Sequence, residues 1–385
     1  MIIEKDYDVI VVGGGSMGTA ASYFLAKQNL RVLLIDQHTI PNEYSSHHGQ
    51  TRMLRFGYGQ GEKYVSLVKS AYQLWKELEE KTNKKLYYQT GALMVGKPNS
   101  TFVEETLKSS INNDLPYESL SAKEIMERWP GITIPTDYIG SFDPLAGFLL
   151  SKECIATYKE QAVLLGVTVL EEEEVTSIDM AEEQITILTA NGNYVSPKLV
   201  VTAGVWIPKL LVNTPLSIDV LRKPVGWFTP TIEGLYDMGQ FPAVVFDSDI
   251  GHYYGFPNFE GTGYKVGRHD TGQPCDPNLV DRTFGAYKED EGDLRSFLEM
   301  YLPQAAGELA HGGVCMYSLT PDSDFIIDFH PQFANVVIAG GFSGHGFKFA
   351  SVVGSILSDL MVYGETPHDI SSFNIQRFKK IGVKS

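Results

Sequence analysis

The 385-residue sequence contains no apolar run approaching the roughly 20 residues that a membrane-spanning helix needs. Its first residues lack the basic segment and apolar stretch of a secretory signal, so we expect a cytosolic protein. Cysteine is rare: Cys154, Cys275 and Cys315 are widely spaced and odd in number, which excludes a disulfide framework and a zinc signature. The sequence also has no internal repeat and no low-complexity tract.

Positive charge is scarce as well. Lysine and arginine number 31 against 47 aspartate and glutamate residues, which gives a formal net charge of −16. Such an acidic chain repels phosphate backbones and anionic lipid, so neither nucleic acid nor a membrane surface is expected as a partner. The remaining composition, 43% hydrophobic and 20% charged, is that of a globular protein, and the length favours two domains or one domain with a large insertion.

The clearest motif lies near the start of the chain. Residues 8–12 (DVIVV) are typical of a buried strand, residues 13–18 read GGGSMG, and residues 19–27 have the small and apolar residues of a packed helix. A second strand is predicted over 31–35 and ends at Asp36. This order of strand, glycine turn, helix, strand and acid is the βαβ fingerprint of dinucleotide binding. A purely structural glycine turn is the alternative.

Each glycine of this motif has a distinct expected task. Gly13 permits the tight turn, Gly15 lets the backbone approach a pyrophosphate, and Gly18 lets the helix pack closely on the strand. The free amides at the helix N-terminus would bind the phosphates, and Asp36 would accept hydrogen bonds from the ribose. The predicted cofactor contacts of this region are Gly13, Gly15, Ser16, Met17, Gly18 and Asp36.

Further elements extend this α/β pattern to the other end of the chain. An amphipathic helix is predicted over 62–82, and strands over 199–201 and 335–339 each run into a glycine turn. Residues 352–361 show an apolar helical stripe after the second turn. Because glycine turns near residues 203 and 341 would add two walls to a cofactor site, the sequence favours a flavin over a nicotinamide.

The intervening stretches are rich in Tyr, Phe, Pro and Gly and contain short strand-like runs. We therefore predict an α/β plus α+β protein, in which a Rossmann-like FAD-binding domain is combined with a discontinuous, mainly β substrate domain. The expected bounds are 1–84, 150–220 and 322–385 for the first domain, and 85–149 and 221–321 for the second.

One polar segment follows the second strand. Residues 46–55 (SHHGQTRMLR) place two imidazoles and two guanidiniums within ten residues. A solvated surface loop is one interpretation. The other is functional, since arginines three positions apart, Arg52 and Arg55, can serve an electron-rich ring and an anionic group, and arginine binds carboxylates in a bidentate way.

Four segments together resemble the monomeric sarcosine oxidase and N-methyltryptophan oxidase family of FAD-dependent amine oxidases. They are residues 13–18, residues 46–55, residues 314–322 (VCMYSLTPD) and residues 341–348 (GFSGHGFK), and the resemblance extends over essentially the whole chain. The segments 314–322 and 341–348 are specific enough to separate this family from flavoproteins in general. The resemblance implies a monomeric flavoprotein whose partners are a small N-methyl amino acid and molecular oxygen.

In this family the cysteine matching Cys315 forms a thioether to the flavin 8-methyl position. The thiolate is the required nucleophile, and a nearby cation such as His48 or Arg52 would favour it. Taken alone, Cys315 would be interpreted as a small buried hydrophobic residue. The resemblance therefore implies covalent FAD, held as an 8α-S-cysteinyl adduct that cannot dissociate.

The resemblance also implies roles for two lysines. Lys348, which matches a carboxylate-binding lysine, is expected to act with Arg55, although cations are normally disfavoured near a helix N-terminus. Lys265 matches the lysine at which oxygen is activated, whereas most strand lysines simply point into water. A fixed cation in a pocket of low dielectric lowers the cost of forming superoxide.

The remaining roles complete the site that the resemblance implies. The catalytic set is Lys265, Arg52, His269 and Tyr317, and the substrate-binding set is Arg55, Lys348, Tyr254 and Gly344. Additional cofactor contacts are Ser46, His48, Arg52, Thr202, Gly204, Cys315, Gly344, Gly346 and Lys348. No metal ligands and no separate side-chain base are expected.

The implied activity is oxidative demethylation of sarcosine and related N-methyl amino acids to the amino acid, formaldehyde and hydrogen peroxide. Phe56 stands where the family has a histidine, and residues 245–247 also differ, so N-methyl-L-tryptophan and cyclic imino acids such as pipecolate or proline stay open as substrates. Two other hypotheses are a dehydrogenase that passes electrons to a protein, disfavoured by Lys265, and an idle FAD-binding scaffold or sensor.

Overall fold

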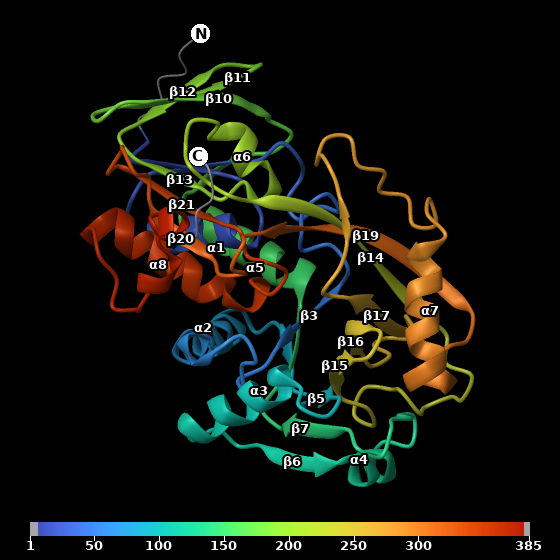
Figure 1. Ribbon diagram of the computed structural model, residues 1–385. Helices are drawn as coiled ribbons and strands as arrows, with labels where there is room; N and C mark the ends of the chain where they lie inside the picture. The colour runs from blue at the N-terminus through green and yellow to red at the C-terminus, as the bar shows by residue number, and fades with distance from the viewer. Residues whose placement is uncertain (1–6, 381–385) are drawn as a thin grey trace.

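The computed structural model of the protein describes residues 7–380, which form two large sheets and two small ones (Figure 1). The six-stranded sheet has the order β20 (Ile326–Phe329), β21 (Val336–Gly340), β13 (Leu199–Val201), β1 (Val9–Val12), β2 (Val32–Ile35), β9 (Thr168–Leu170). All its neighbouring strands are parallel except β20 and β21. The predicted strands over 8–12, 31–35, 199–201 and 335–339 all occur in this sheet, within one residue of the expected bounds at each end.

The second large sheet has nine strands. In order they are β18 (Gln273–Pro274), β14 (Asp219–Phe228), β17 (Tyr264–Arg268), β16 (Gly251–Phe256), β15 (Ala243–Ser248), β5 (Ala92–Gly96), β7 (Ile139–Asp143) and β6 (Glu118–Ser121), and β19 (Leu309–Leu319) also pairs with β14. One small sheet has the order β10 (Val175–Met180), β11 (Ile185–Thr189), β12 (Asn193–Ser196). The other has the order β3 (Thr51–Leu54), β8 (Gly147–Leu150), β4 (Tyr87–Tyr88). The predicted combination of a parallel α/β sheet with a mainly β second part is confirmed, whereas the domain bounds stay a prediction.

Helices cover both sheets. They are α1 (Ser16–Lys27), α2 (Val65–Thr82), α3 (Thr101–Asn112), α4 (Ala122–Arg128), α5 (Ser151–Leu164), α6 (Ile207–Leu210), α7 (Glu289–Tyr301), α8 (Ala350–Tyr363) and α9 (Arg377–Lys380), with 3₁₀ turns η1 (Glu62–Tyr64), η2 (Gly204–Trp206), η3 (Pro303–Ala305), η4 (Phe347–Phe349) and η5 (Ser371–Phe373). The helix expected over 62–82 is therefore two elements, a 3₁₀ turn after Gly61 and then α2. Among the described residues, no helix has the length and apolar character required to cross a bilayer.

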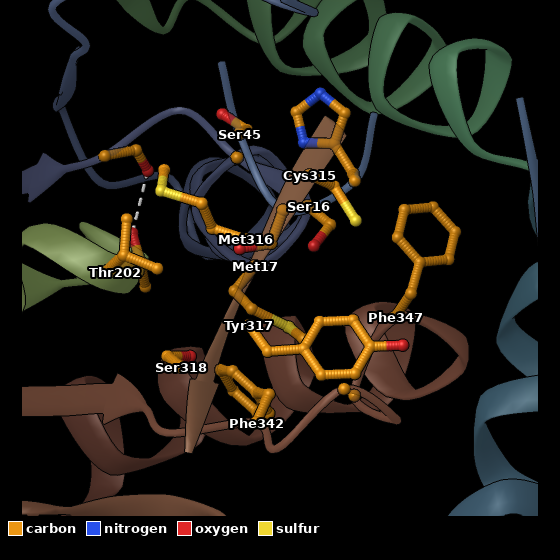
Figure 2. A pocket seen from close by; sticks show the side chains of 18 of the residues that line it. Ser16, Met17, Ser45, Thr202, Cys315, Met316, Tyr317, Ser318, Phe342 and Phe347 are labelled. Carbon is orange, nitrogen blue, oxygen red and sulfur yellow. Dashed lines mark hydrogen bonds between the residues drawn. The ribbon is translucent and has the colours of Figure 1, made fainter. Parts of the chain in front are cut away.

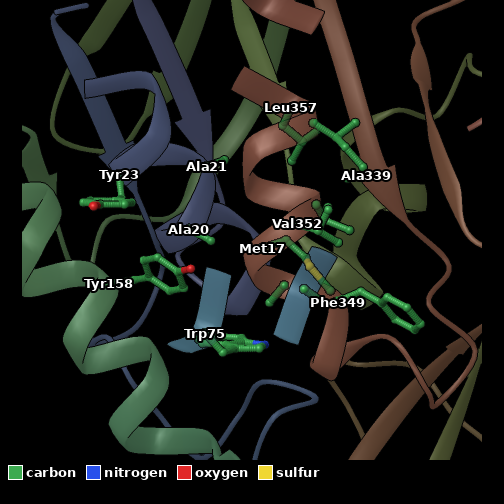
Figure 3. Packing of buried hydrophobic residues seen from close by; sticks show 14 of the residues in the cluster. Met17, Ala20, Ala21, Tyr23, Trp75, Tyr158, Ala339, Phe349, Val352 and Leu357 are labelled. Carbon is green, nitrogen blue, oxygen red and sulfur yellow. The ribbon is translucent and has the colours of Figure 1, made fainter. Parts of the chain in front are cut away.

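The core of the parallel sheet is built around α1, which packs between α5 and α8 (Figure 3). Small residues allow this close approach: a Cβ added to Gly354 of α8 would lie 2.6 Å from the Cβ of Ala20. Tyr158 of α5 and Trp75 of α2 fill the other side of the cluster (Figure 3). Because α1 is clamped in this way, its N-terminus is held at a fixed place at the carboxyl end of β1.

The two faces of the nine-stranded sheet differ. On one face α7 packs against buried aromatic residues, including Phe246 and Tyr253. A bidentate pair between Arg222 of β14 and Asp290 of α7, at 2.5 and 2.7 Å, is part of this contact and is fully buried. The opposite face carries Tyr254 and Cys315 toward a cavity between the two large sheets. Strands β14 and β19 run side by side across this region (Figure 1).

Candidate active site

A cavity of about 480 Å³ extends from the carboxyl ends of the parallel strands to the open face of the nine-stranded sheet. Figure 2 shows β19 crossing this cavity with Cys315 and Tyr317, while Thr202 and Phe347 stand on opposite sides of the strand. The volume lies within the range of small-molecule and cofactor sites. Residues far apart in the sequence line it, so the fold and not one motif creates the site.

One end of the cavity is formed by the N-terminus of α1. No side chain caps this helix and no acidic residue lies in its first turn. No side chain therefore neutralises the positive end of the helix dipole here. A Cβ added to Gly15 would meet no atom within 4 Å, which means that the backbone here borders open space. Gly13 has φ +102°, and a Cβ there would lie 2.6 Å from the carbonyl oxygen of Thr202. The turn thus requires glycine and leaves an anion-binding helix end exposed to the cavity.

Asp36 stands at the same end, directly after β2. Its carboxylate accepts hydrogen bonds from the amides of Gly14 (2.6 Å) and His38 (2.8 Å). Burial nevertheless raises the pKa of this carboxyl to about 6, so additional donors from a bound ligand would favour its ionised form. Gly18 does not line the cavity: a Cβ there would lie 1.8 Å from the carbonyl oxygen of Gly13, so its task is the helix–strand contact predicted for it.

The wall opposite α1 is β19. Cys315 is only 2% exposed and lines the cavity, as does Tyr317 two residues later on the same strand face. The ring of Tyr317 packs on the turn after β21: a Cβ added to Gly344, which has φ +76°, would lie 2.2 Å from it. Gly344 thereby lets the chain pass close to this wall, an approach that any side chain there would block, whereas a Cβ added to Gly346 would lie 2.4 Å from Phe342.

Two buried cations mark the closed end. The Arg55 guanidinium donates to the carbonyl oxygen of Gly57 (2.8 Å) and to Gln60 Oε1 (2.7 Å), and it lies 4.4 Å from the ring centre of Tyr58. Lys348 Nζ donates to the His345 carbonyl oxygen (2.8 Å) and to Tyr58 Oη (3.2 Å). No carboxylate among the described residues pairs with either cation, and burial lowers the pKa of both. A ligand carboxylate would supply the missing negative charge.

A short hydrogen-bonded chain holds Lys348 in place. His345 Nε2 lies 3.1 Å from the carbonyl oxygen of Ser323, to which it donates, so its Nδ1 accepts from Tyr58 Oη at 2.8 Å. The Tyr58 oxygen in turn accepts from Lys348. Because burial and the Lys348 charge lower the pKa of His345, its ring is neutral in this arrangement.

Lys265 of β17 lies beside the cavity and does not itself line it. Its Nζ donates to the carbonyl oxygens of Gly49 and Thr51, the latter at 2.9 Å, and is flanked by the rings of Phe256 (4.8 Å) and Trp227 (5.3 Å). The side chain is 2% exposed, and burial lowers its pKa. Lys265 is therefore not one of the strand lysines that point into water, the alternative to its predicted place at the site.

The segment after β2 contributes the remaining polar groups. Arg52 lines the cavity, and its guanidinium donates to the carbonyl oxygens of Ser46 (2.9 Å), Thr51 (2.8 Å) and His48. His48 is outside the cavity wall, and burial lowers its pKa, so at neutral pH it is uncharged and does not supply the cation expected beside Cys315. His47, for which no role was predicted, lines the cavity with its Nε2 buried and without a partner among the described residues.

His269, directly after β17, and Tyr254 of the neighbouring strand β16 both line the cavity with Tyr317. The ring centres of His269 and Tyr317 are 5.7 Å apart, and burial lowers the pKa of His269 to about 3, so this ring is also neutral. Most predicted site residues thus share one cavity. Those lining it are Gly13, Gly15, Ser16, Met17, Asp36, Ser46, Arg52, Arg55, Thr202, Gly204, Tyr254, His269, Cys315, Tyr317, Gly344, Gly346 and Lys348, and those outside it are Gly18, His48 and Lys265.

Other lining residues were missed from the sequence. Trp206 and Glu174 border the nucleotide end, and Gln60, Phe102 and His252 border the far end. They come from the first turn of α3 (Phe102), from β16 (His252), from η2 (Trp206) and from loops, and none belongs to a motif, so only the spatial arrangement identifies them. Alternation along residues 252–256 could have placed His252 on the same strand face as Tyr254.

Comparisons with known proteins agree with this geometry. A model of the FAD dependent oxidoreductase family matches residues 8–360. The monomeric sarcosine oxidase of Arthrobacter sp. (strain TE1826) is 47% identical over 98% of both chains, and the N-methyl-L-tryptophan oxidase of Yersinia pestis (strain Pestoides F) is 38% identical over 97% of this chain and 100% of its own.

Solved structures share the fold across the whole chain. NikD, an amino acid oxidase of nikkomycin biosynthesis, superposes with a TM-score of 0.85 at 25% identity and covers 96% of this chain and 97% of its own. L-proline dehydrogenase from P. horikoshii has a TM-score of 0.85 at 22% identity, with 98% of both chains covered. The chain therefore belongs to the FAD-dependent oxidoreductases, and within them to the family of monomeric sarcosine oxidases and N-methyltryptophan oxidases.

Proposed function

We propose that the protein is an FAD-dependent oxidase that demethylates sarcosine and related N-methyl amino acids, releasing the amino acid, formaldehyde and hydrogen peroxide. The observation that carries this proposal is the pair Arg55 and Lys348, two buried cations of one cavity that form no ion pair with a carboxylate within residues 7–380. A cavity that begins at a bare helix N-terminus and ends at a carboxylate site fits a dinucleotide and a small acid together.

The residues present fit FAD. The α1 amides would hold the pyrophosphate, Asp36 the ribose, and the face of β19 the isoalloxazine ring. Bound FAD would supply the acceptor for the two electrons and the proton removed from the N-methyl carbon. We propose an 8α-S-cysteinyl linkage through Cys315, supported by the position of this thiol on the cavity wall.

The protein's own groups would orient the substrate and control its charge. Arg55 and Lys348 would bind the carboxylate, which fixes the amine near the rings of Tyr254 and Tyr317. A hydride can leave the N-methyl carbon only when the amine nitrogen is unprotonated. Burial and the two nearby cations disfavour the ammonium form of the substrate. Because the His269 ring is neutral, it can contact the amine by hydrogen bonding without adding charge. Lys265 would provide the fixed positive charge that favours reduction of oxygen.

A second substrate class is supported by the part of the cavity next to Arg55, which lies 5.2 Å from the ring centre of Phe102. Its wall includes Val245, Phe102 and His252, and the rings of the last two lie 6.4 Å apart. N-methyl-L-tryptophan or a cyclic imino acid such as pipecolate or proline is therefore the second candidate. Peroxide assays on these compounds and on sarcosine decide between the two classes. If one of these compounds has a higher kcat/KM than sarcosine, that compound and not sarcosine is the preferred substrate.

Two simple observations test the chemistry itself. Sarcosine added without oxygen should bleach the flavin band, and under air each substrate consumed should yield one hydrogen peroxide. Absence of bleaching would support an idle scaffold, and bleaching without peroxide would support a dehydrogenase with a protein acceptor.

The proposed linkage has its own test. Acid precipitation of the parent protein should leave the yellow colour in the pellet, whereas Cys315→Ala should release FAD into the supernatant. Release from the parent would disprove the covalent attachment and leave the oxidase proposal intact. We also propose a cytosolic location, with which three free cysteines are consistent. We propose in addition that the protein is a monomer, and light scattering at micromolar concentration would measure its molar mass.

A further inference from the structure

Lys223 of β14 is a buried cation to which the proposed reaction gives no task. Its side chain is 1% exposed, and no carboxylate among the described residues forms an ion pair with it. Nζ donates to the carbonyl oxygens of His269 (3.1 Å) and Thr271 and lies 4.8 Å from the ring centre of Tyr317. Burying a lysine without a counter-charge is costly, so its presence calls for an anion that forms nearby.

The strand register identifies that anion. Strands β14 and β19 are antiparallel, and Lys223 is directly opposite Cys315. Directly opposed residues project from the same face with Cβ atoms about 4.5–5.5 Å apart. Lys223 and Cys315 therefore form a cross-strand pair on the face of the sheet that is turned toward the cavity.

The other candidates for this task are less suitable. His48 is uncharged at neutral pH, and Arg52 and Lys265 bind the backbone of residues 46–51, whereas Lys223 alone of these cations stands directly opposite Cys315 in the strand register. Burial lowers the pKa of Lys223 to about 8, so it is still mainly protonated at pH 7. Negative charge at Cys315 is among the causes that hold the pKa of Lys223 up against this burial.

We propose that Lys223 stabilises the Cys315 thiolate and thereby promotes bond formation between Cys315 and the flavin 8-methyl carbon. This inference rests on the covalent linkage proposed above. The step forms one C–S bond and breaks the S–H bond and one methyl C–H bond. The two electrons pass to the flavin ring and then to molecular oxygen, which leaves with both protons as hydrogen peroxide. One oxygen is consumed per attachment, and no amine substrate is needed.

The experiment uses full-length apoprotein from a flavin-depleted host, mixed with FAD in air and quenched with acid at timed intervals. Covalent flavin is read from in-gel fluorescence and from the mass of the intact chain. Lys223→Gln keeps a donor for the two carbonyls but removes the charge, so attachment should slow by about tenfold or more. Lys223→Arg should restore most of the rate, and Lys198→Gln, which alters a remote lysine bound to the Met361 carbonyl, should match the parent.

The outcomes separate this inference from the linkage it rests on. If the parent itself forms no covalent flavin, both fail. If the parent attaches flavin and Lys223→Gln does so at the same rate, or Lys223→Arg is as slow as Lys223→Gln, the role of the Lys223 charge is disproved while the linkage stands.

A second measurement applies even if the variants do not fold. In the parental apoprotein at pH 7, iodoacetamide should alkylate Cys315 faster than Cys275, although Cys275 is more exposed and its pKa is raised by burial. Slower alkylation of Cys315 would overturn the inference.

Discussion

The two ends of the cavity bind negative charge by different means. At the α1 end, backbone amides and the helix dipole face the cavity, and the side chain that completes the site is the carboxylate of Asp36. At the other end, the charged side chains Arg55 and Lys348 stand in a buried wall without carboxylate partners among the described residues.

The difference follows from the ligand that each end is proposed to hold. Amides carry no net charge, so they can stay ready for a permanently bound pyrophosphate at little electrostatic cost. Buried lysine and arginine are costly without an anion, and the lowered pKa values of Lys348 and Arg55 reflect that cost. At the substrate end, pairing with the substrate carboxylate would therefore offset the cost of burying Arg55 and Lys348, and this would favour binding of the acid. Substitutions at Arg55 and Asp36 test the two ends directly, and one at Lys265 sharpens the contrast with a buried cation beside the cavity that is proposed to act on oxygen and not on a bound acid.

The largest effect is expected at Lys265. Replacing it by methionine should leave anaerobic reduction of the flavin nearly intact and slow reoxidation by oxygen on the order of 10²–10³-fold, because a fixed charge near the electron donor is lost. Stopped-flow absorbance of the two half-reactions measures both rates. Lys265→Arg is the matched control, since it keeps the positive charge. An equal loss of rate in both half-reactions would contradict the proposal that Lys265 activates oxygen.

Arg55→Ala should weaken substrate binding by about 2–4 kcal/mol, since a charge-assisted contact to the carboxylate disappears. The effect should be seen mainly in KM, measured by peroxide release across sarcosine concentrations. Arg128→Ala removes an exposed arginine paired with Glu118 at 2.8 Å and should not change KM. A fall in kcat at unchanged KM would contradict the proposed carboxylate site.

Asp36→Asn should give the smallest effect, about tenfold in FAD affinity at pH 8, as one charge-assisted hydrogen bond is weakened. Cys315→Ala serves as the background so that binding is reversible and can be followed by flavin fluorescence. Ribose donors favour the ionised carboxylate, so affinity in the Asp36 protein should fall as the pH drops through about 6. The Asp36→Asn protein should lack this pH dependence, and a parallel decline in both would rule out Asp36 as its source.

These two ends also differ in what the sequence alone could predict. The strands around residues 13–18, the helix start and Asp36 were predicted because the whole binding unit is contiguous, with spacing fixed by the βαβ geometry. Arg55 was considered for anion binding from its spacing to Arg52, whereas Lys265 and Lys348 were singled out only through a family resemblance, since nothing local distinguishes a buried lysine from an exposed one. His252, Phe102 and Lys223 were not identified because their importance depends on strand register and on how turns pack.

The helix α2 has a consequence for engineering. Its Trp75 donates from Nε1 to the Lys348 carbonyl oxygen at 2.8 Å, and its Ala71 carbonyl oxygen accepts from Ser351 at 2.9 Å. An amphipathic helix outside the sheets therefore anchors the backbone that carries Lys348, the lysine proposed to bind the substrate. Libraries confined to cavity positions would leave this support untouched. Randomising the inner surface of α2 offers a way to retune selectivity for amino acids of different length while every residue in contact with the substrate keeps its identity.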